Sequence, residues 1–204
     1  MSSLQCPARL VLARHGEADY ETDLVTDDGG SLSAAGRQQA RALGESLRGE
    51  RVARVWTSPL SRAVQTAELA AGVLGTDVVV RNGLREYGVG SLAGIDGDEG
   101  ATIGPVFRAW AEGDDTAAID GGEVVGDIVA RVHAVLREVA DAHRGETALV
   151  VSHGGAILAS VPGLVGAPRL SSYDLVLPNC GFVVLEADDE GWRLVRWDAA
   201  HTVR

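Results

Sequence analysis

Two short apolar runs in this chain are each followed by a histidine within two residues. Leu10 to Ala13 leads into the turn Arg14-His15-Gly16-Glu17, and Thr147 to Ser152 leads into His153-Gly154-Gly155. A short apolar run that stops at a charged or glycine-containing turn is typical of a buried strand. In open α/β sheets, the carboxyl ends of the strands border the crevice where ligands bind. The two runs therefore predict a parallel sheet with both histidines at one edge, beside a ligand site.

The rest of the chain alternates between strand and helix patterns. Further strands are predicted at residues 54–57, 78–80, 182–185 and 192–197, the last two joined by a turn at 188–191. Helices are predicted after the capping residue Ser33, from Ser58-Pro59 to Gly75, and from about 123 to 142. This alternation favours an α/β fold in which helices cover both faces of a mostly parallel sheet, with one antiparallel edge.

Chain length and local composition predict the domain organisation. A chain of 204 residues is expected to form one domain, 1–204. The segment at about 95–122 is rich in glycine, alanine and acidic residues, and is expected to be a short cap over the site, helical around 105–111.

The charge of the chain limits its partners. Its formal net charge is −11, and all 18 basic residues are arginines. Nucleic acids and acidic membranes need a basic face, so neither is an expected partner. No apolar run approaches the ~18 residues of a membrane span and no apolar leader is present, so a cytoplasmic protein is expected. Cys6 and Cys180 show neither disulfide nor zinc spacing; both are expected to be buried small residues.

Five side chains are candidates for the functional site. His15 and His153 follow the two apolar strands, and Arg14 accompanies the first of them. Arg62 lies in the first turn of its helix, where free N–H groups and the helix dipole favour an anion. Glu86 lies in a loop after the 78–80 strand. Two imidazoles, two guanidiniums and one carboxylate at strand ends predict phosphoryl transfer.

The residue types explain how such a site would work. A neutral imidazole attacks phosphorus well when its other nitrogen donates to a carbonyl, which fixes the tautomer. Arginines stabilise the charge on the non-bridging oxygens through charge-assisted hydrogen bonds. A carboxylic acid such as Glu86 can protonate the departing alkoxide and then, as a base, activate the water that hydrolyses the phospho-imidazole. Because arginines hold the phosphoryl group, neither a metal nor a cofactor is expected.

The motifs of this chain, in their order, resemble those of the histidine phosphatase superfamily, which has the phosphoglycerate mutase-like fold. They lie at residues 12–17, 32–40, 57–67, 84–94, 121–123 and 151–155 and span nearly the whole chain. The resemblance implies a three-layer α/β/α sandwich. It also implies that His15 is the phosphorylated nucleophile and Glu86 the proton donor. The phosphate-binding residues that it implies are Arg14, Gly16, Glu21, Arg62, His153 and Gly154.

This family includes phosphatases and phosphoglycerate mutases, and the sequence bears on which activity to expect. Tyr87 follows Glu86, where the family's phosphoglycerate mutases carry an arginine, and the short cap has one arginine, Arg108. These features favour a metal-independent phosphomonoesterase acting on a small phosphorylated metabolite. A cofactor-dependent phosphoglycerate mutase is the alternative.

Departures from the family pattern leave a third alternative open. Ala18 and Glu21 replace a small hydroxyl residue and an asparagine that commonly touches the phosphate, and Val124 stands where serine is frequent. A carboxylate at position 21 would repel phosphate unless it points away or pairs with an arginine. A catalytically weak phospho-ligand-binding module is therefore the alternative from a different class.

Other polar and aromatic residues have structural explanations. Glu123 is expected to be structural or peripheral, and His133 and His143 are expected on the surface of the long helix. Trp110 is expected to anchor the cap. An exposed sheet edge is compatible with a homodimer.

Overall fold

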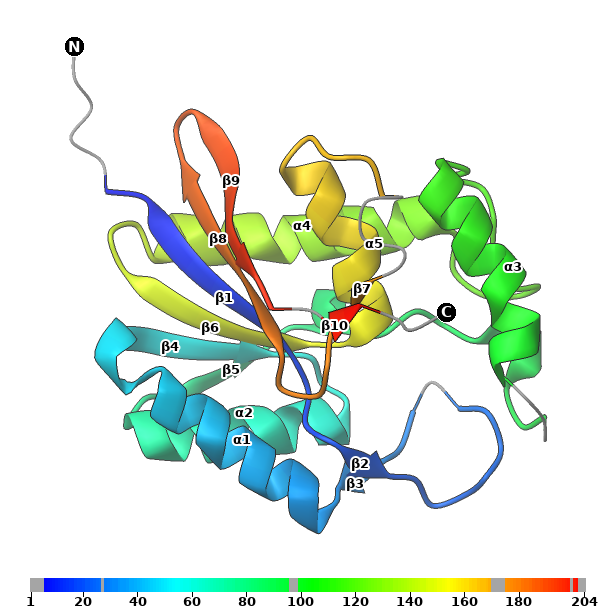
Figure 1. The fold of residues 1–204 in the computed structure, drawn as a ribbon, viewed down its shortest axis with the longest axis horizontal. Helices are drawn as coiled ribbons and strands as arrows, with labels where there is room; N and C mark the ends of the chain where they lie inside the picture. The colour runs from blue at the N-terminus through cyan, green and yellow to red at the C-terminus, as the bar shows by residue number, and fades with distance from the viewer. Residues whose placement is uncertain (1–5, 27, 96–98, 170–174, 199, 202–204) are drawn as a thin grey trace.

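The computed structural model describes residues 6–26, 28–95, 99–169, 175–198 and 200–201. Its centre is a six-stranded sheet in the order β5-β4-β6-β1-β8-β9 (Figure 1). The strands are β1 (Ala8–Arg14), β4 (Val52–Thr57), β5 (Val78–Val80), β6 (Thr147–Ser152), β8 (Phe182–Asp188) and β9 (Gly191–Trp197). The first four are parallel, whereas β8 runs antiparallel to β1, and β9 antiparallel to β8. The prediction of a mostly parallel sheet with one antiparallel edge is confirmed.

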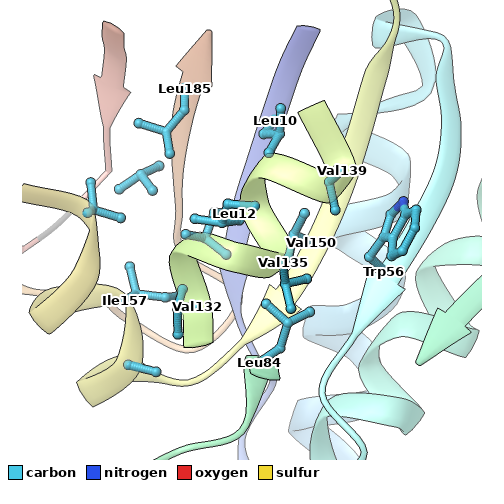
Figure 2. Packing of buried hydrophobic residues seen from close by; sticks show 14 of the residues in the cluster. Leu10, Leu12, Trp56, Leu84, Val132, Val135, Val139, Val150, Ile157 and Leu185 are labelled. Carbon is cyan, nitrogen blue, oxygen red and sulfur yellow. The ribbon is translucent and has the colours of Figure 1, made fainter. Parts of the chain in front are cut away.

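Helices cover both faces of this sheet. Helices α1 (Ala34–Ser46) and α2 (Ser61–Leu74) lie on one face, and α4 (Val125–Ala142) and α5 (Gly154–Leu164) on the other (Figure 1). The alternation of side chains along β1 joins the layers, since Leu10 and Leu12 pack with residues of α4 and α5 (Figure 2). Val11 and Ala13 point the other way and pack with residues of α1 and α2. The three-layer α/β/α sandwich is therefore confirmed.

Smaller elements lie around the carboxyl edge of the parallel strands. They are β2 (Ala18–Asp19), β3 (Ser31–Leu32), α3 (Glu99–Glu112), β7 (Leu175–Val176), β10 (Ala200–His201) and the 3₁₀ turns Asn82–Leu84 and Gly90–Leu92. A further 3₁₀ turn, Arg48–Glu50, lies at the opposite edge, directly before β4. Helix α3 belongs to the predicted cap and is longer than the expected 105–111. None of the helices in the described part of the chain is long and apolar enough to cross a membrane.

Local sequence explains most helix boundaries. The Ser33 hydroxyl accepts the Gly36 N–H at 3.0 Å and caps α1. Gly75 ends α2 in the left-handed conformation, with φ 70°. One boundary prediction is wrong: α2 begins at Ser61 and not at Ser58-Pro59, because Leu60 is extended and Ser58 Oγ accepts the Leu60 N–H. Helix α5 has no counterpart in the prediction, since its alanines and glycines show little helical periodicity.

Three predictions of residue exposure are wrong. His133 and His143 are buried, because each finds a partner outside its own helix or turn. His133 Nε2 lies 2.8 Å from the Ser160 carbonyl oxygen, and His143 Nε2 accepts the indole N–H of Trp56 at 3.1 Å. Cys6 is exposed, because it precedes β1 and lies outside the core.

The Ser33 cap leads to a test of local stability. We expect Ser33→Ala to lower the free energy of unfolding by about 1 kcal/mol, because the Gly36 N–H loses its acceptor at the start of α1. Urea unfolding followed by circular dichroism measures this change. Ser46→Ala in the last turn of the same helix is the control, and is expected to have a smaller effect. An equal loss in the two variants would show that the cap is not the cause.

Candidate active site

Strand register brings His15 and His153 together. Strands β1 and β6 are parallel neighbours in which Arg14 pairs with Ser152, so the next residue of each strand is one of the histidines. The two ring centroids are 5.1 Å apart, and the rings are tilted by 59°. Both side chains are buried, His15 at 6% and His153 at 0% exposure. The two apolar runs therefore place both imidazoles at the carboxyl edge of the sheet.

The surroundings of His15 define its tautomer and its charge. Nδ1 lies 2.7 Å from the Gly16 carbonyl oxygen, which can only accept, so Nδ1 carries the proton and Nε2 keeps a free lone pair. Burial lowers the pKa of His15 to about 4 against the raising effect of the Gly16 hydrogen bond, and the charges of Arg62 and Arg14 lower it further. The imidazole is therefore neutral at pH 7 and has the form that a nucleophile needs.

Arg14 and Arg62 approach these rings from two elements. Arg14 ends β1 and donates from Nη1 to the Leu177 carbonyl at 2.9 Å. Arg62 lies in the first turn of α2 and donates from Nη1 to the Gly29 carbonyl at 2.8 Å, while its guanidinium lies 5.6 Å from the Tyr20 ring centroid. Each arginine also has a buried Nε without a hydrogen-bond partner among the described residues.

His153 adds a third buried nitrogen to this group. Its Nε2 lies 2.8 Å from Ser58 Oγ, and its Nδ1 has no partner in the described part of the chain. Ser58 Oγ already accepts the Leu60 N–H, so its proton can go to His153 Nε2, which leaves the ring proton on Nδ1. Burial lowers the pKa of His153 well below its ordinary value, and the proximity of His15 and Arg62 lowers it further. Buried donors are nearly always paired in proteins, so three unpaired ones together indicate a site for an anion.

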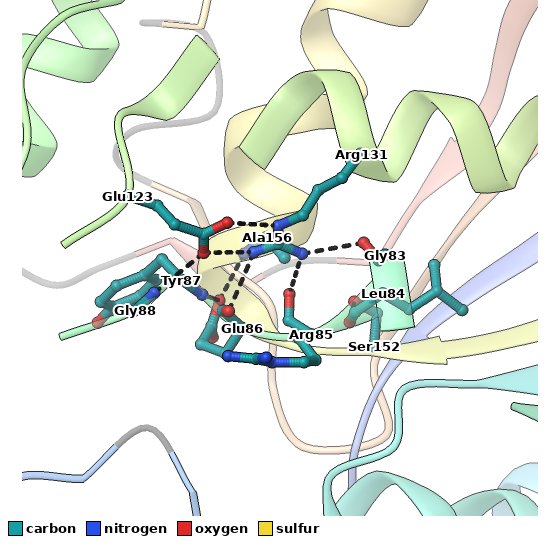
Figure 3. Close-up of polar contacts among 10 residues, drawn as sticks. All are labelled: Gly83, Leu84, Arg85, Glu86, Tyr87, Gly88, Glu123, Arg131, Ser152 and Ala156. Carbon is teal, nitrogen blue, oxygen red and sulfur yellow. Dashed lines mark hydrogen bonds and ion pairs between the residues drawn. The ribbon is translucent and has the colours of Figure 1, made fainter. Parts of the chain in front are cut away.

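Glu86 is held at the start of α5. Its carboxylate accepts the N–H groups of Ala156 at 2.7 Å and Tyr87 at 3.2 Å (Figure 3). It also accepts the N–H of Gly155 at 3.0 Å. Burial raises the pKa of Glu86, although these hydrogen bonds and Arg62 oppose the rise. Residue 155 must be glycine, because a Cβ there would lie 2.6 Å from the Tyr87 ring. The three N–H groups therefore fix the direction of the Glu86 carboxyl group, and burial raises its affinity for a proton.

The remaining predicted site residues lie near this group but have other partners. The Gly16 N–H donates to Thr66 Oγ1 at 3.0 Å, and its carbonyl accepts from His15. Gly154 opens α5, and a Cβ on it would lie 3.6 Å from Arg14 Cδ. Glu21 Oε2 accepts the Gly30 N–H at 3.0 Å, which lowers the pKa of Glu21 and ties its carboxylate to its own loop.

Several supporting residues were not singled out from the sequence. Thr66 Oγ1 accepts the Gly16 N–H and donates to the Arg62 carbonyl, so one hydroxyl joins the His15 turn to α2. Asn179 Nδ2 donates to the His15 carbonyl at 3.2 Å. Thr66 and Ser58 lie inside the 57–67 motif, so this motif could have identified them as site residues. No motif surrounds Asn179, so the sequence gives no indication of its role. No group of three or more His, Cys, Asp or Glu side chains within the described ranges could hold a metal ion.

Comparisons with known proteins agree on the family. The model of the histidine phosphatase superfamily (branch 1) matches residues 10–200. The probable phosphoglycerate mutase GpmB of Salmonella choleraesuis is 30% identical over 195 residues, which cover 93% of this chain and 89% of the relative.

Solved structures extend this agreement to the fold. A protein described as mycobacterial hydrolase 1 has a TM-score of 0.79 at 30% identity, covering 95% of this chain and 99% of its own. A mycobacterial glucosyl-3-phosphoglycerate phosphatase in complex with VO3 has a TM-score of 0.78 at 30% identity, covering 94% and 99%. The chain therefore belongs to branch 1 of the histidine phosphatase superfamily and has the phosphoglycerate mutase-like fold.

Proposed function

We propose that this protein is a metal-independent phosphomonoesterase that hydrolyses a small phosphorylated metabolite through a phosphohistidine on His15. One observation carries the proposal: the neutral His15 lies beside three buried nitrogens without partners among the described residues, on Arg14, Arg62 and His153. A phosphoryl group supplies the oxygen acceptors that these nitrogens lack.

The first step forms the phosphoenzyme. The lone pair of His15 Nε2 attacks phosphorus, and the bond between phosphorus and the alcohol oxygen breaks. Glu86, in the acid form that its burial favours by raising its pKa, gives its proton to the departing oxygen. Arg14, Arg62 and His153 donate hydrogen bonds to the non-bridging oxygens and stabilise the negative charge on these oxygens in the transition state.

The second step returns the enzyme to its starting form. The Glu86 carboxylate takes a proton from water as the water oxygen attacks phosphorus, and the bond to His15 Nε2 breaks. Gly16 acts through its carbonyl, which keeps the proton of His15 on Nδ1. Gly154 contributes through the N-terminal dipole of α5. Glu21 acts indirectly, because its carboxylate holds the N–H of Gly30, and the carbonyl of the preceding Gly29 accepts a hydrogen bond from Arg62.

The residue after Glu86 favours hydrolysis over phosphate transfer. The Tyr87 ring packs edge-on against Phe107 and Trp110, with ring centroids 5.2 and 5.7 Å away. An aromatic side chain packed in this way offers no cation to a second phosphate or a carboxylate. The similarity to a probable phosphoglycerate mutase keeps the mutase as the second candidate.

Phosphate release across a panel of phosphorylated metabolites tests the proposal. The panel includes sugar phosphates and 3-phosphoglycerate, each assayed with a metal chelator present, and mutase activity is measured in parallel. We expect hydrolysis that the chelator does not reduce. Interconversion of phosphoglycerates without net release would support the mutase. Binding of inorganic phosphate without turnover of any compound would support the phospho-ligand-binding module.

A further inference from the structure

One arginine that has no role in the proposed reaction forms hydrogen bonds with the main chain around Glu86. Arg131 on α4 donates from Nη1 to the carbonyl oxygens of Gly83 at 2.9 Å and Arg85 at 2.6 Å (Figure 3). Its Nη2 donates to the carbonyl of Glu86 itself at 3.0 Å. A single guanidinium therefore holds three carbonyls of the loop that carries the proposed acid.

Glu123 completes the arrangement from the other side of Glu86. Its Oε1 accepts from Arg131 Nε at 2.8 Å, and its Oε2 accepts from Arg131 Nη2 at 2.9 Å. The same Oε2 accepts the N–H of Gly88 at 3.1 Å. The pair thus bonds the main chain both before and after Glu86. Its side chains are only partly exposed, 21% for Arg131 and 32% for Glu123, so water replaces these bonds poorly.

We propose that Arg131 and Glu123 are positioning residues that hold the Glu86 carboxyl at the distance from the leaving-group oxygen at which it can transfer a proton. This inference rests on the proposed function. The carboxylate is attached to α5 through Gly155 and Ala156, and the main chain of the same residue is attached to α4 through Arg131. Glu86 is therefore fixed at both ends between two helices of one layer. A displacement of about 1 Å in a proton-transfer group can cost 10²-fold in rate.

The geometry requires arginine at position 131. Its planar fork reaches three carbonyls and a carboxylate at once, whereas a lysine ammonium has three donors on a flexible stem and no fixed plane. Arg131→Lys keeps the charge and removes the fork. The variant therefore changes the position of Glu86 and leaves the net charge of the site as it was.

The test compares two aryl phosphates of similar shape that differ in their need for an acid. The phenolate of 4-nitrophenyl phosphate leaves without protonation, whereas that of phenyl phosphate needs it. We expect Arg131→Lys to lower kcat/KM, which reports formation of the phosphoenzyme, by about 10²-fold for phenyl phosphate and far less for 4-nitrophenyl phosphate. In a Glu86→Gln background, Arg131→Lys is expected to add little further loss, because the group that it positions is already gone.

Two further variants separate positioning from folding. Arg81→Lys is the matched control, because Arg81 forms a forked ion pair with Glu138, which is also on α4, and its other side-chain hydrogen bond within the described ranges goes to the Val80 carbonyl. It is expected to leave both rates unchanged. Glu123→Gln keeps the shape of the second partner and is expected to reproduce the selective loss in weaker form.

The outcomes also distinguish the two proposals. An active wild type in which Arg131→Lys lowers kcat/KM equally for both compounds, or in which the losses of kcat/KM from Arg131→Lys and Glu86→Gln are additive, overturns the positioning role alone. A wild type that hydrolyses neither compound nor any member of the metabolite panel overturns the phosphatase proposal, and the positioning role with it.

Discussion

His15→Ala is expected to lower kcat/KM for phosphate release by about 10⁴-fold or more, the scale seen when a covalent nucleophile is removed. Alanine offers no lone pair to phosphorus, while Arg14, Arg62 and His153 remain to bind the phosphoryl group. Phosphate affinity is therefore expected to change much less than turnover. Phosphate release and inhibition by inorganic phosphate, measured on both proteins, give the two quantities.

His133→Asn is the control for this variant. His133 is also a buried imidazole bonded to a backbone carbonyl, but it lies between α4 and α5 and contacts Ser160. We expect this substitution to lower stability and to leave kcat/KM close to that of the wild type. A rapid quench of the wild type in alkaline denaturant during turnover should trap phosphate on the chain that is stable in base and labile in acid. Retention of more than a tenth of the activity by His15→Ala would contradict the nucleophile assignment.

Glu86→Gln is expected to lower kcat/KM for phenyl phosphate by about 10²–10⁴-fold and to change the shape of the pH profile. In the proposed mechanism, the wild type requires neutral His15 and protonated Glu86. Activity should rise as pH increases through the pKa of His15, about 4, and fall as pH passes the raised pKa of Glu86. Glutamine keeps the size of the side chain but cannot exchange a proton.

The falling limb that belongs to Glu86 is therefore expected to disappear in Glu86→Gln, while the rising limb stays. Ionisation of the substrate contributes to both profiles equally, so the difference between the two proteins isolates the enzyme's carboxyl group. Steady-state rates from about pH 3.5 to 9, at constant ionic strength, supply the comparison. An identical falling limb in both proteins would assign it to another group and remove Glu86 as the acid.

The sheet could be predicted because the patterns that specify its strands lie within short, continuous stretches of the sequence. Leu10 to Ala13 and Thr147 to Ser152 are apolar runs buried on both faces, and each ends in the histidine that marks the site. Arg62 was placed correctly in the first turn of its helix, although the helix begins three residues later than expected. Periodicity and turn residues are sufficient for such features.

Features that depend on distant partners could not be predicted. A histidine on a helix counts as polar in any periodic pattern, so the burial of His133 and His143 follows only from Ser160 and Trp56. The direction of the Glu21 carboxylate depends on where a loop brings Gly30. The bonds from Arg131 to the Glu86 loop join segments 45 to 48 residues apart and leave no periodic trace.

The place of β1 in the sheet has a consequence for synthesis on the ribosome. This strand precedes the other strands of the sheet along the chain, yet its two neighbours are β6 and β8, which begin only at Thr147 and Phe182. Residues 8–14 therefore remain without either strand partner until these later segments are translated, and an apolar strand edge is open to aggregation during that period. The pocket around His15 is also completed late, because the pairing that brings His153 beside it spans most of the chain. Nascent chains that end before β6 are therefore expected to lack the assembled site and to be inactive.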